Sequence, residues 1–318
     1  MKKDLLTLRD LSADDFEALF LRAFELKGRY GRGIPDRTLC GKTLGLIFDK
    51  ASTRTRVSFE AAMIQLGGTP LFLNVGDTQL IRNEPIADTA RVLSRYLDGL
   101  VVRTYSQDLL EELAAAASIP VINGLTDFSH PCQVLSDIMT ILEKKGRLEG
   151  LKIVWVGDGN NVAHSWLNAS VILGLHLVLS CPEGYYPKEE VLGPALKDSS
   201  GSIVVLSDPR EAVGDADVIY TDVWASMGQE SESAYRKTVF RPFQVDQALV
   251  ALAKADVMVM HCLPAHRGEE ITGNVLEGAQ SVVWDQPENK LHMHKAILEK
   301  LLVTRDPRVD GGASCREK

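Results

Sequence analysis

Short apolar runs alternate with stretches of helical periodicity along most of the chain. The run at 44–48 is typical of a buried strand, and the apolar spacing that follows it predicts a helix that ends at the Gly67-Gly68 pair. Ser52 is the expected N-cap of that helix, with Val57, Ala61, Ile64 and Leu66 recurring at helical spacing. The same reading predicts strands at 70–75, 99–104, 121–123, 152–156, 176–179, 203–206, 217–220, 256–260 and 282–284, and helices at 4–30, 86–96, 109–117, 134–144, 163–173 and 289–302.

Strands that alternate with helices form parallel sheets, which bind ligands at the carboxyl ends of their strands. The pattern restarts after Gly146, and 318 residues exceed the usual length of one domain. We therefore predict an α/β protein of two domains, with the first at 1–146 and the second at 147–288.

Composition and charge exclude several classes of function. The 35 basic and 43 acidic residues are mixed along the chain, so we expect no nucleic-acid partner and no membrane surface. The apolar runs are shorter than the roughly 20 residues of a membrane span, and early charges argue against a signal peptide. Five scattered cysteines, an odd number, favour a reducing compartment over a disulfide framework. We expect a cytoplasmic protein.

The first candidate site is Ser-Thr-Arg-Thr-Arg at 52–56, between a strand and a helix. A helix N-terminus offers unpaired N–H groups and the positive end of its dipole, and this turn adds hydroxyl and guanidinium groups. Such a turn suits a phosphate-like anion. Arg54 is expected to face the ligand, and Arg56 to serve packing or a subunit contact. A capped helix with solvated arginines is the structural alternative.

Other candidates also follow predicted strands. Arg103 ends one strand, His130 lies just before a proline and a helix, and residues 222–230 follow another strand with an acid that suits an amino group. The polar loop at 76–85, which contains Gln79, could reach a ligand. Each has a structural alternative: an ordinary loop, a cap, or a buried Trp and Met.

Two motifs suggest rival functions. Residues 157–162 resemble the dinucleotide turn G-x-G-x-x-G, with Val162 at the third glycine position, which would favour an NAD-dependent oxidoreductase. The next strand lacks a well-placed acidic residue at its end, so the fingerprint is weak. His261, Cys262 and His266 suggest zinc, but no second ligand pair lies nearby in the sequence, and we expect no metal.

Taken in order, these motifs resemble the aspartate/ornithine carbamoyltransferase family. Ser-Thr-Arg-Thr-Arg-Val-Ser-Phe-Glu at 52–60, Arg103, and His-Pro-Cys-Gln at 130–133 are similar to its carbamoyl-phosphate set. The Ser-Met-Gly core within 222–230 and His-Cys-Leu-Pro at 261–264 are similar to its ornithine-specific members, whereas aspartate-specific members carry proline where Cys262 stands. Lys290 departs from the arginine usual in the family, and a lysine keeps the charge but loses the bidentate fork.

The resemblance implies two doubly wound parallel-sheet domains joined by two interdomain helices. The C-terminal segment 289–318 would return to the carbamoyl-phosphate-binding domain at 1–146, leaving 147–288 as the ornithine-binding domain. It also implies a homotrimer with active sites near subunit interfaces. A non-catalytic paralogue, or an enzyme for acetylated ornithine, putrescine or another amine, stays open.

The implied reaction transfers the carbamoyl group of carbamoyl phosphate to the δ-amine of L-ornithine, giving L-citrulline and phosphate for arginine biosynthesis, with no cofactor. The implied catalytic residues are Arg103, His130, Asp222 and Cys262. The implied carbamoyl-phosphate-binding residues are Ser52, Thr53, Arg54, Thr55, Gln79, Arg103, His130, Gln133, Cys262, Leu263 and Lys290, and the ornithine-binding residues are Asn161, Asp222, Ser226 and Met227.

Overall fold

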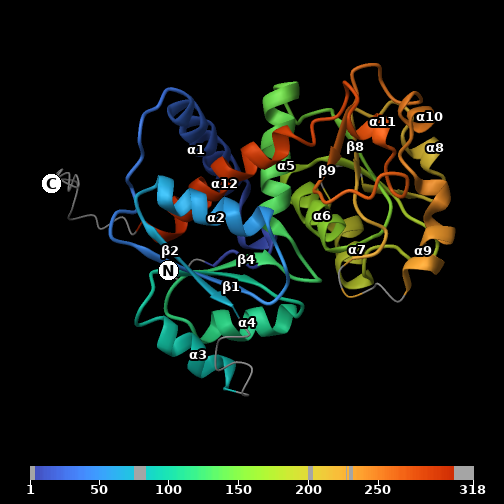
Figure 1. Ribbon diagram of the computed structural model, residues 1–318. Coiled ribbons are helices and arrows are strands. Elements are labelled where there is room, and N and C mark those ends of the chain that lie inside the picture. Colours follow the sequence, from blue (N-terminus) through green and yellow to red (C-terminus); the bar gives the residue numbers. More distant parts are fainter. Residues whose placement is uncertain (1–3, 75–83, 200–202, 227, 229–231, 304–318) are drawn as a thin grey trace. The chain divides into compact units, whose positions relative to one another are not determined.

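The chain forms two compact units in the computed structural model, which describes residues 4–74, 84–199, 203–226, 228 and 232–303. Unit 1 comprises Met1–Leu135 and Pro287–Lys318, and unit 2 comprises Ser136–Gln286. The chain passes between the units twice, both times within a helix: α5 (Pro131–Lys145) and α12 (Asp285–Leu302) (Figure 1). The predicted fold class, two parallel-sheet α/β domains joined by two helices, is confirmed.

Unit 1 is built on a parallel sheet with the strand order β2-β1-β3-β4. Figure 1 shows α3 and α4 on one side of this sheet and α1, α2 and α12 on the other. Its strands are β1 (Thr43–Phe48), β2 (Thr69–Asn74), β3 (Gly99–Arg103) and β4 (Val121–Leu125), and its remaining elements are η1 (Leu8–Asp10), α1 (Ala13–Gly31), α2 (Arg54–Gln65), α3 (Ile86–Leu93) and α4 (Gln107–Ala116).

The two central strands, β1 and β3, are almost entirely buried, as expected for parallel strands covered on both faces. Between the sheet and the helices α3 and α4, Ile47 and Val102 pack with Ala90, Leu110 and Leu113. This core fixes the positions from which the loops at the carboxyl ends of β1, β3 and β4 leave the sheet.

The N-termini of α1 and α2 are capped differently, and the N-cap of α2 is not the predicted residue. Ser12 caps α1 with a capping box, in which it exchanges hydrogen bonds with Asp15. Ser52 is not the N-cap of α2. Thr53 occupies that position with a helical backbone, and its side chain makes no capping hydrogen bond.

Two of the apolar residues whose spacing predicted α2 do not lie on its buried face. Val57 and Ile64 are 54% and 61% exposed. The helix buries Thr55, Phe59, Ala62 and Met63 instead. Both sets recur at helical spacing, and Phe59 and Met63 supply the larger side chains to the core.

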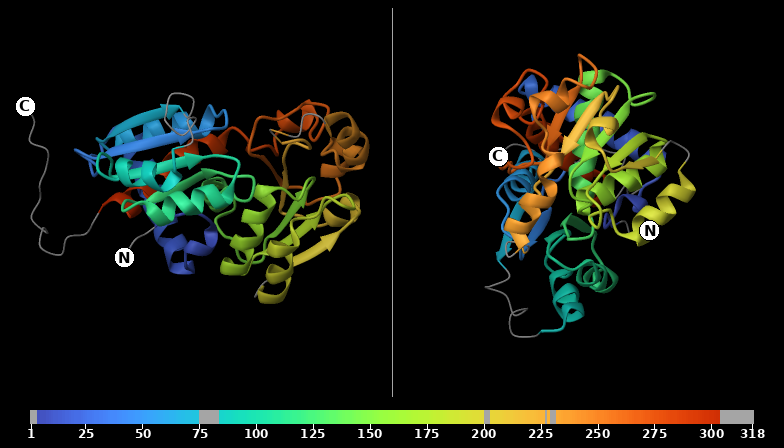
Figure 2. Two further views of the ribbon diagram at one scale, coloured as in Figure 1. Left: turned by 90° about the horizontal axis from the view of Figure 1, so that it is seen from below. Right: turned by 90° about the vertical axis from the view of Figure 1, so that its right-hand side faces the viewer.

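Unit 2 is built on a parallel sheet with the order β7-β6-β5-β8-β9. The views in Figure 2 show helices on both faces of each sheet. The strands are β5 (Lys152–Val156), β6 (His176–Ser180), β7 (Ile203–Leu206), β8 (Val218–Thr221) and β9 (Met258–His261), and the helices are α6 (Asn161–Leu173), α7 (Glu189–Asp198), α8 (Pro209–Ala212), α9 (Ser233–Phe240), η5 (Arg241–Phe243), α10 (Gln247–Val250) and α11 (Gly273–Leu276).

Alternation along β5 sends its side chains to opposite faces of the sheet. Val154 and Val156 join the apolar cluster that includes residues of α8, α10 and α11. Trp155, on the other face, stacks on Tyr220 with ring centroids 5.2 Å apart, and Trp166 of α6 meets Tyr220 edge-on at 5.8 Å. Both faces are therefore closed by core packing.

The predicted strand at 282–284 is wrong. Ser281 forms a single bridge to Val259, after which the chain turns and α12 begins at Asp285. Val283 is apolar because it packs into the core cluster of unit 2.

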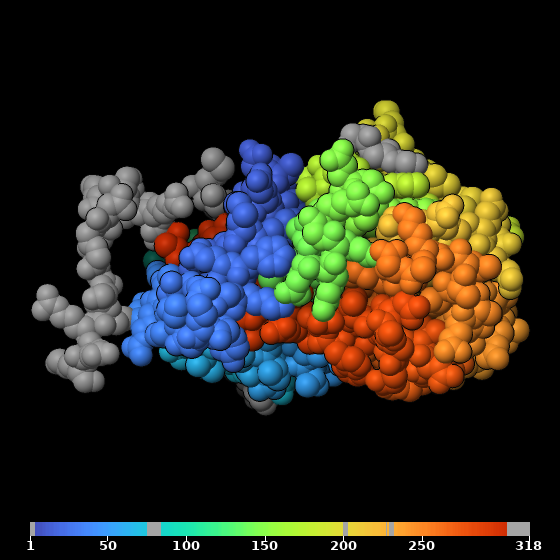
Figure 3. Space-filling view, turned by 90° about the horizontal axis from the view of Figure 1, so that it is seen from above, coloured from blue at the N-terminus to red at the C-terminus, as the bar shows by residue number. Residues whose placement is uncertain are grey.

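In the space-filling view, α1 and the blue segment that follows it lie at the surface of unit 1 (Figure 3). Among the described residues, no helix combines the length and the apolar character that crossing a membrane requires.

Candidate active site

Three candidate segments of unit 1 leave the sheet at the carboxyl ends of its strands. Strand register pairs Phe48 of β1 with Arg103 of β3, and Arg103 with Leu125 of β4. The loop to Ser52, Arg103 itself and the loop to His130 therefore begin side by side. The strand order reverses at β1, which is where open α/β sheets bind their ligands.

The N-terminus of α2 is suited to an anion. Its first turn contains no acidic residue, and no side chain of the N-cap residue occupies its backbone N–H groups. Arg54 is the first helical residue, and Thr55 is 2% exposed. The absence of a Ser52 cap, which the sequence analysis did not foresee, leaves these N–H groups available to a ligand.

Lys290 lies among the residues expected to bind the carbamoyl group. Its Nζ donates to Oγ1 of Thr55 at 3.1 Å and to Oε1 of Gln133 at 2.7 Å. Gln133 is on α5 and Lys290 on α12. The lysine therefore joins three elements of unit 1 at a buried point.

His130 precedes α5 and is 4% exposed. Burial lowers its pKa well below 6.5, and the positive charges of Lys290 and Arg103 lower it further. The imidazole is therefore neutral at neutral pH and can donate one N–H. The same cations that keep it neutral favour an anionic ligand.

Lys50 was not among the sequence candidates, although it helps to hold the loops at the carboxyl ends of these strands. Its buried ammonium pairs with Asp127, in the loop after β4, and lies 4.2 Å from the ring centroid of Tyr105, after β3. One side chain from the loop after β1 thus contacts both neighbouring loops. Its sequence context offered no signal of this role.

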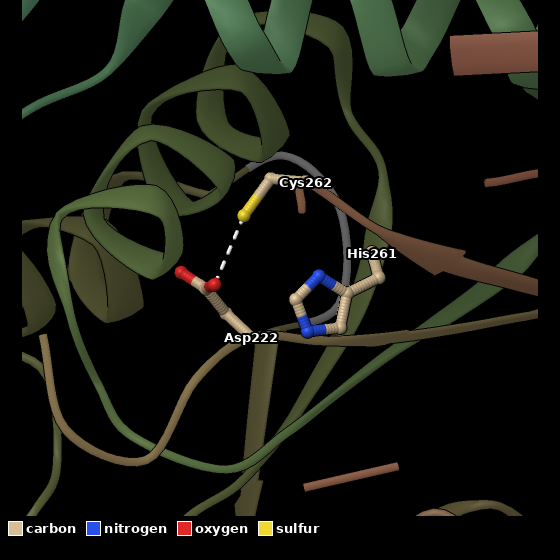
Figure 4. Close-up of side chains that lie close together, drawn as sticks. All are labelled: Asp222, His261 and Cys262. Carbon is tan, nitrogen blue, oxygen red and sulfur yellow. Dashed lines mark hydrogen bonds between the residues drawn. The ribbon is translucent and has the colours of Figure 1, made fainter. Parts of the chain in front are cut away.

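In unit 2, the candidates follow three adjacent strands. Val156 of β5 is in register with Thr221 of β8, and Thr221 with His261 of β9. Asp222 and Cys262 are consequently neighbours, and Sγ of Cys262 donates to Oδ1 of Asp222 at 2.9 Å (Figure 4).

Asn160, just before α6, contacts Asp222. Its Nδ2 donates to Oδ2 of Asp222 at 2.7 Å. Its Oδ1 accepts the N–H groups of Val162 and Ala163 as the N-cap of α6. Asn160 was missed as a site residue, and the available signal was an Asn directly before a helix.

Leu263 is held in a left-handed conformation, with φ of 57°. Its N–H donates to Nδ1 of His261 at 2.8 Å, so Nε2 carries the proton of the neutral ring, and Nε2 lies 3.1 Å from Oε1 of Glu270. A non-glycine residue adopts this conformation only where its surroundings enforce it. His261 and Glu270 thereby fix the chain direction next to Cys262.

The residues of the zinc hypothesis fall into two separate groups. His261 lies with Asp222 and Cys262, whereas His266 lies with Glu269 and Glu270. Both ring nitrogens of His261 already have partners, so metal binding there would break one of those contacts.

The turn that resembles a dinucleotide site is filled by the protein itself. A side-chain carbon at Gly159 would lie 2.2 Å from the backbone N of Pro187 and 2.4 Å from the carbonyl carbon of Tyr186. Gly159 therefore admits the chain's own backbone at the point where a dinucleotide turn would admit a pyrophosphate.

Two predicted site residues, Gln79 and Met227, lie outside the described residues. Ser226 is half-buried, two residues beyond Trp224.

Known proteins resemble the chain over most of its length. Residues 3–143 match the family model described as the carbamoyl-P binding domain of aspartate/ornithine carbamoyltransferase, and residues 149–301 match the Asp/Orn binding domain. The ornithine carbamoyltransferase of Syntrophus aciditrophicus is 59% identical over 302 residues, covering 95% of this chain and 100% of that protein.

A Pyrococcus furiosus protein named as anabolic ornithine carbamoyltransferase is 57% identical over 299 residues, covering 93% of this chain and 95% of that protein. A solved ornithine carbamoyltransferase structure from Pyrococcus furiosus has a TM-score of 0.91 at 56% identity, covering 94% of this chain and 97% of that one. The enzyme structure from Burkholderia thailandensis has a TM-score of 0.87 at 42% identity, covering 95% and 99%. The chain belongs to the aspartate/ornithine carbamoyltransferase family.

Proposed function

We propose that the protein transfers the carbamoyl group of carbamoyl phosphate to the δ-amine of L-ornithine, giving L-citrulline and phosphate. The observation that carries the choice of acceptor is the contact between Cys262 and Asp222 at the ends of adjacent strands. A carboxylate beside a thiol would suit a substrate amine and its proton, which supports this choice of acceptor. The anabolic Pyrococcus relative supports a role in arginine biosynthesis.

We assign carbamoyl phosphate to 1–146 and 289–318. Ser52, Thr53, Arg54 and Arg103 would hold the phosphate, and Gln79 would reach it from its loop. Thr55, Arg103 and the neutral His130 would donate to the carbonyl oxygen as negative charge develops, a stabilisation worth several kcal/mol in comparable sites. Gln133, held by Lys290, would accept from the carbamoyl nitrogen.

We assign ornithine to 147–288. Asp222, Cys262 and the Leu263 carbonyl would surround the δ-amine, and removal of water around the amine would favour its neutral, nucleophilic form. Asn161, Ser226 and Met227 would hold the α-amino and α-carboxylate groups. The amine attacks the carbonyl carbon, the bond to the phosphate oxygen breaks, and phosphate leaves with the proton that the amine nitrogen gives up. Carbamoyl phosphate is already an activated donor, so the step requires no cofactor.

We further propose a homotrimer. Val57 and Ile64 lie seven residues apart on α2 and are more than half exposed, and Leu71 on the edge strand β2 is 46% exposed. Arg56 is ordered beside them, with its guanidinium 3.5 Å from the ring centroid of Phe72 and its Nε 3.0 Å from Glu60. An exposed apolar surface of this kind is typical of a subunit interface.

The trimer is tested by light scattering coupled to gel filtration. The double variant Val57→Glu and Ile64→Glu should elute at a lower mass than the wild type. A trimer that persists in this variant would contradict the proposed interface.

We propose a cytoplasmic location, which the free thiols of Cys40, Cys132, Cys181 and Cys262 support.

The function is tested by a citrulline assay with carbamoyl phosphate and, separately, ornithine, acetylornithine, putrescine and aspartate at equal concentration. We expect product with ornithine. Product only with another acceptor would preserve the carbamoyl chemistry and overturn the roles of Asp222, Ser226 and Met227. No product with any acceptor would support a non-catalytic paralogue.

The oxidoreductase hypothesis is tested in parallel with NADH. Trp155 lies on β5 beside the turn, and Trp224 follows β8, so a bound nicotinamide should quench their fluorescence. We expect no saturable quenching.

A further inference from the structure

Arg236, on α9, is a buried cation that is not assigned to either substrate. Its side chain is 7% exposed, and its guanidinium lies 4.7 Å from the ring centroid of Tyr185 and 5.6 Å from that of Phe240. Burying a charge costs free energy unless charged and polar partners compensate it. The partners of Arg236 therefore indicate why an arginine stands here.

One partner is the main chain of the acceptor loop. Nη1 of Arg236 donates to the carbonyl oxygen of Trp224 at 2.7 Å. Trp224 is two residues after Asp222 and two before Ser226, both assigned to ornithine. Its indole is 2% exposed and stacks on Phe240 at 6.0 Å, so side chain and main chain are fixed together.

The second partner belongs to the neighbouring loop. The same Nη1 lies 3.2 Å from Oδ2 of Asp158, whose side chain is 10% exposed. The carbonyl oxygen of Asp158 accepts the N–H of Asn160 at 2.8 Å, and Asn160 in turn donates to Asp222. Arg236 thus joins the loop after β5 to the loop after β8.

We propose that Arg236 and Asp158 form a positioning pair for the acceptor substrate, which holds Asp222 and Ser226 in the arrangement that binds the amino acid. This inference rests on the proposed function. Neither residue is assigned to substrate, and both act through the two loops they join. A lysine could not replace Arg236 fully, because it lacks the second donor, Nε, that contacts Glu232 and the planar guanidinium that lies over the ring of Tyr185.

The charge on Asp158 makes the pair sensitive to pH. Burial raises the pKa of Asp158 to about 6, Arg236 opposes the rise, and the charges of Asp222 and Glu232 add to it. Cys181 also faces Asp158, as a thiol whose pKa burial raises. Glu232 pairs with Nε of Arg236 at 3.3 Å, from the start of α9. Below about pH 6, Asp158 takes up a proton and the ion pair with Arg236 is lost.

The test compares Arg236→Met and Arg236→Lys with the wild type by steady-state kinetics in both substrates. Loss of the buried pair should raise the ornithine KM by about tenfold or more, while the carbamoyl-phosphate KM stays within about twofold. Lys237→Met is the matched control, since Lys237 is the next residue of α9, is half exposed and pairs with Glu269. The control should leave both KM values unchanged.

Asp158→Asn provides a readout that a purely structural role would not change. The wild-type ornithine KM should rise as the pH falls through about 6, and Asp158→Asn should have a raised KM without that dependence. Titration of ornithine itself affects both proteins equally and cancels in the comparison. This variant also decides the question if Arg236→Met does not fold.

The outcomes separate the inference from the proposed function. If the wild type makes citrulline and both Arg236→Lys and Asp158→Asn keep its ornithine KM, only the positioning pair is overturned. An equal rise of both KM values would also overturn it, because it would indicate general damage. Failure of the wild type to make citrulline would overturn the proposed function and this inference with it.

Discussion

The ammonium group of Lys290 lies 2.7 Å from Oε1 of Gln133 and donates a hydrogen bond to it. This contact orients the Gln133 amide, because an ammonium group can only donate and so binds the oxygen. The NH2 of Gln133 then points elsewhere. Lys290 also donates to Thr55, which leaves the hydroxyl proton of Thr55 for another acceptor. The Thr55 proton suits the carbonyl oxygen of the carbamoyl group, which needs a donor, and the second lone pair of Gln133 Oε1 suits the carbamoyl nitrogen.

Lys290→Met should weaken carbamoyl-phosphate binding. A hydrogen bond to a charged group contributes about 1.5–3 kcal/mol, so the carbamoyl-phosphate KM should rise by about ten- to a hundredfold. The ornithine KM should change less, since Lys290 contacts the carbamoyl-phosphate residues. Steady-state kinetics with each substrate varied in turn measures both effects.

Lys300→Met is the control for this variant. Lys300 lies on the same helix and pairs with Asp15 near the surface, where an ion pair contributes about 0–1 kcal/mol. Its kinetics should match those of the wild type. Wild-type kinetics for Lys290→Met as well would show that Thr55 and Gln133 need no cation to orient them.

Asp222→Asn should spoil the use of ornithine and preserve carbamoyl-phosphate binding. The substitution keeps the shape of the side chain but removes the charge that would balance the substrate amine, and it disturbs the acceptors used by Asn160 and Cys262. We expect a lower kcat and a higher ornithine KM. Carbamoyl-phosphate binding, measured by calorimetry, should stay as in the wild type.

Asp217→Asn separates this effect from simple destabilisation. Asp217 lies just before β8, at the opposite end of the strand, and accepts from the N–H of Lys152 and from Nζ of Lys254. Its substitution should lower the free energy of unfolding and leave the ornithine KM unchanged. If Asp222→Asn behaved in the same way, Asp222 would have only a structural role.

The sequence was sufficient for features that depend on chain order. Arg103 and Asp222 were expected at the carboxyl ends of parallel strands, and they lie at the ends of β3 and β8. The fold class followed from the alternation of elements for the same reason. These inferences do not require knowing which distant segments lie next to each other in the folded protein.

Features that depend on partners distant in sequence were not predicted. Lys50 and Arg236 acquire their roles from loops and rings that the sequence does not show to be adjacent. The helical spacing of Val57 and Ile64 predicted α2 but not its buried face, because periodicity does not show which of two stripes faces inward. Val283 resembled part of a strand because core packing, as well as strand pairing, selects apolar residues.

Stability should fall as the pH decreases from about 7 to 6. Burial and the charge of Lys290 lower the pKa of His294 well below 6.5, and His130 is affected in the same direction. The unfolded chain therefore binds more protons below pH 6.5 than the folded chain. Each histidine's contribution is complete above that pH and declines below it, by up to about 1.4 kcal/mol per pH unit.

His294→Gln should flatten this dependence. The glutamine can keep the hydrogen bond to Ser58, although it loses the stacking on Phe59, whose ring centroid lies 3.7 Å away. Urea unfolding at several pH values gives the slope for both proteins. Asp158 acts in the opposite direction below about pH 6, because its raised pKa lets the folded state bind a proton first. An unchanged slope between pH 7 and 6 would mean that folding does not lower the pKa of His294.

Gly159→Ala should destabilise unit 2. The added methyl group would lie 2.2 Å from Pro187 N, so backbone must shift, and overpacking of this kind costs about 1–3 kcal/mol. Gly31→Ala is the matched control, since a carbon there meets nothing within 4 Å and alanine favours the helix. Urea midpoints should fall for the first variant and stay equal or rise for the second. A Gly159→Ala protein as stable as the wild type would mean that the loop at Tyr186 can move away from this turn, and the argument against a nucleotide there would fail.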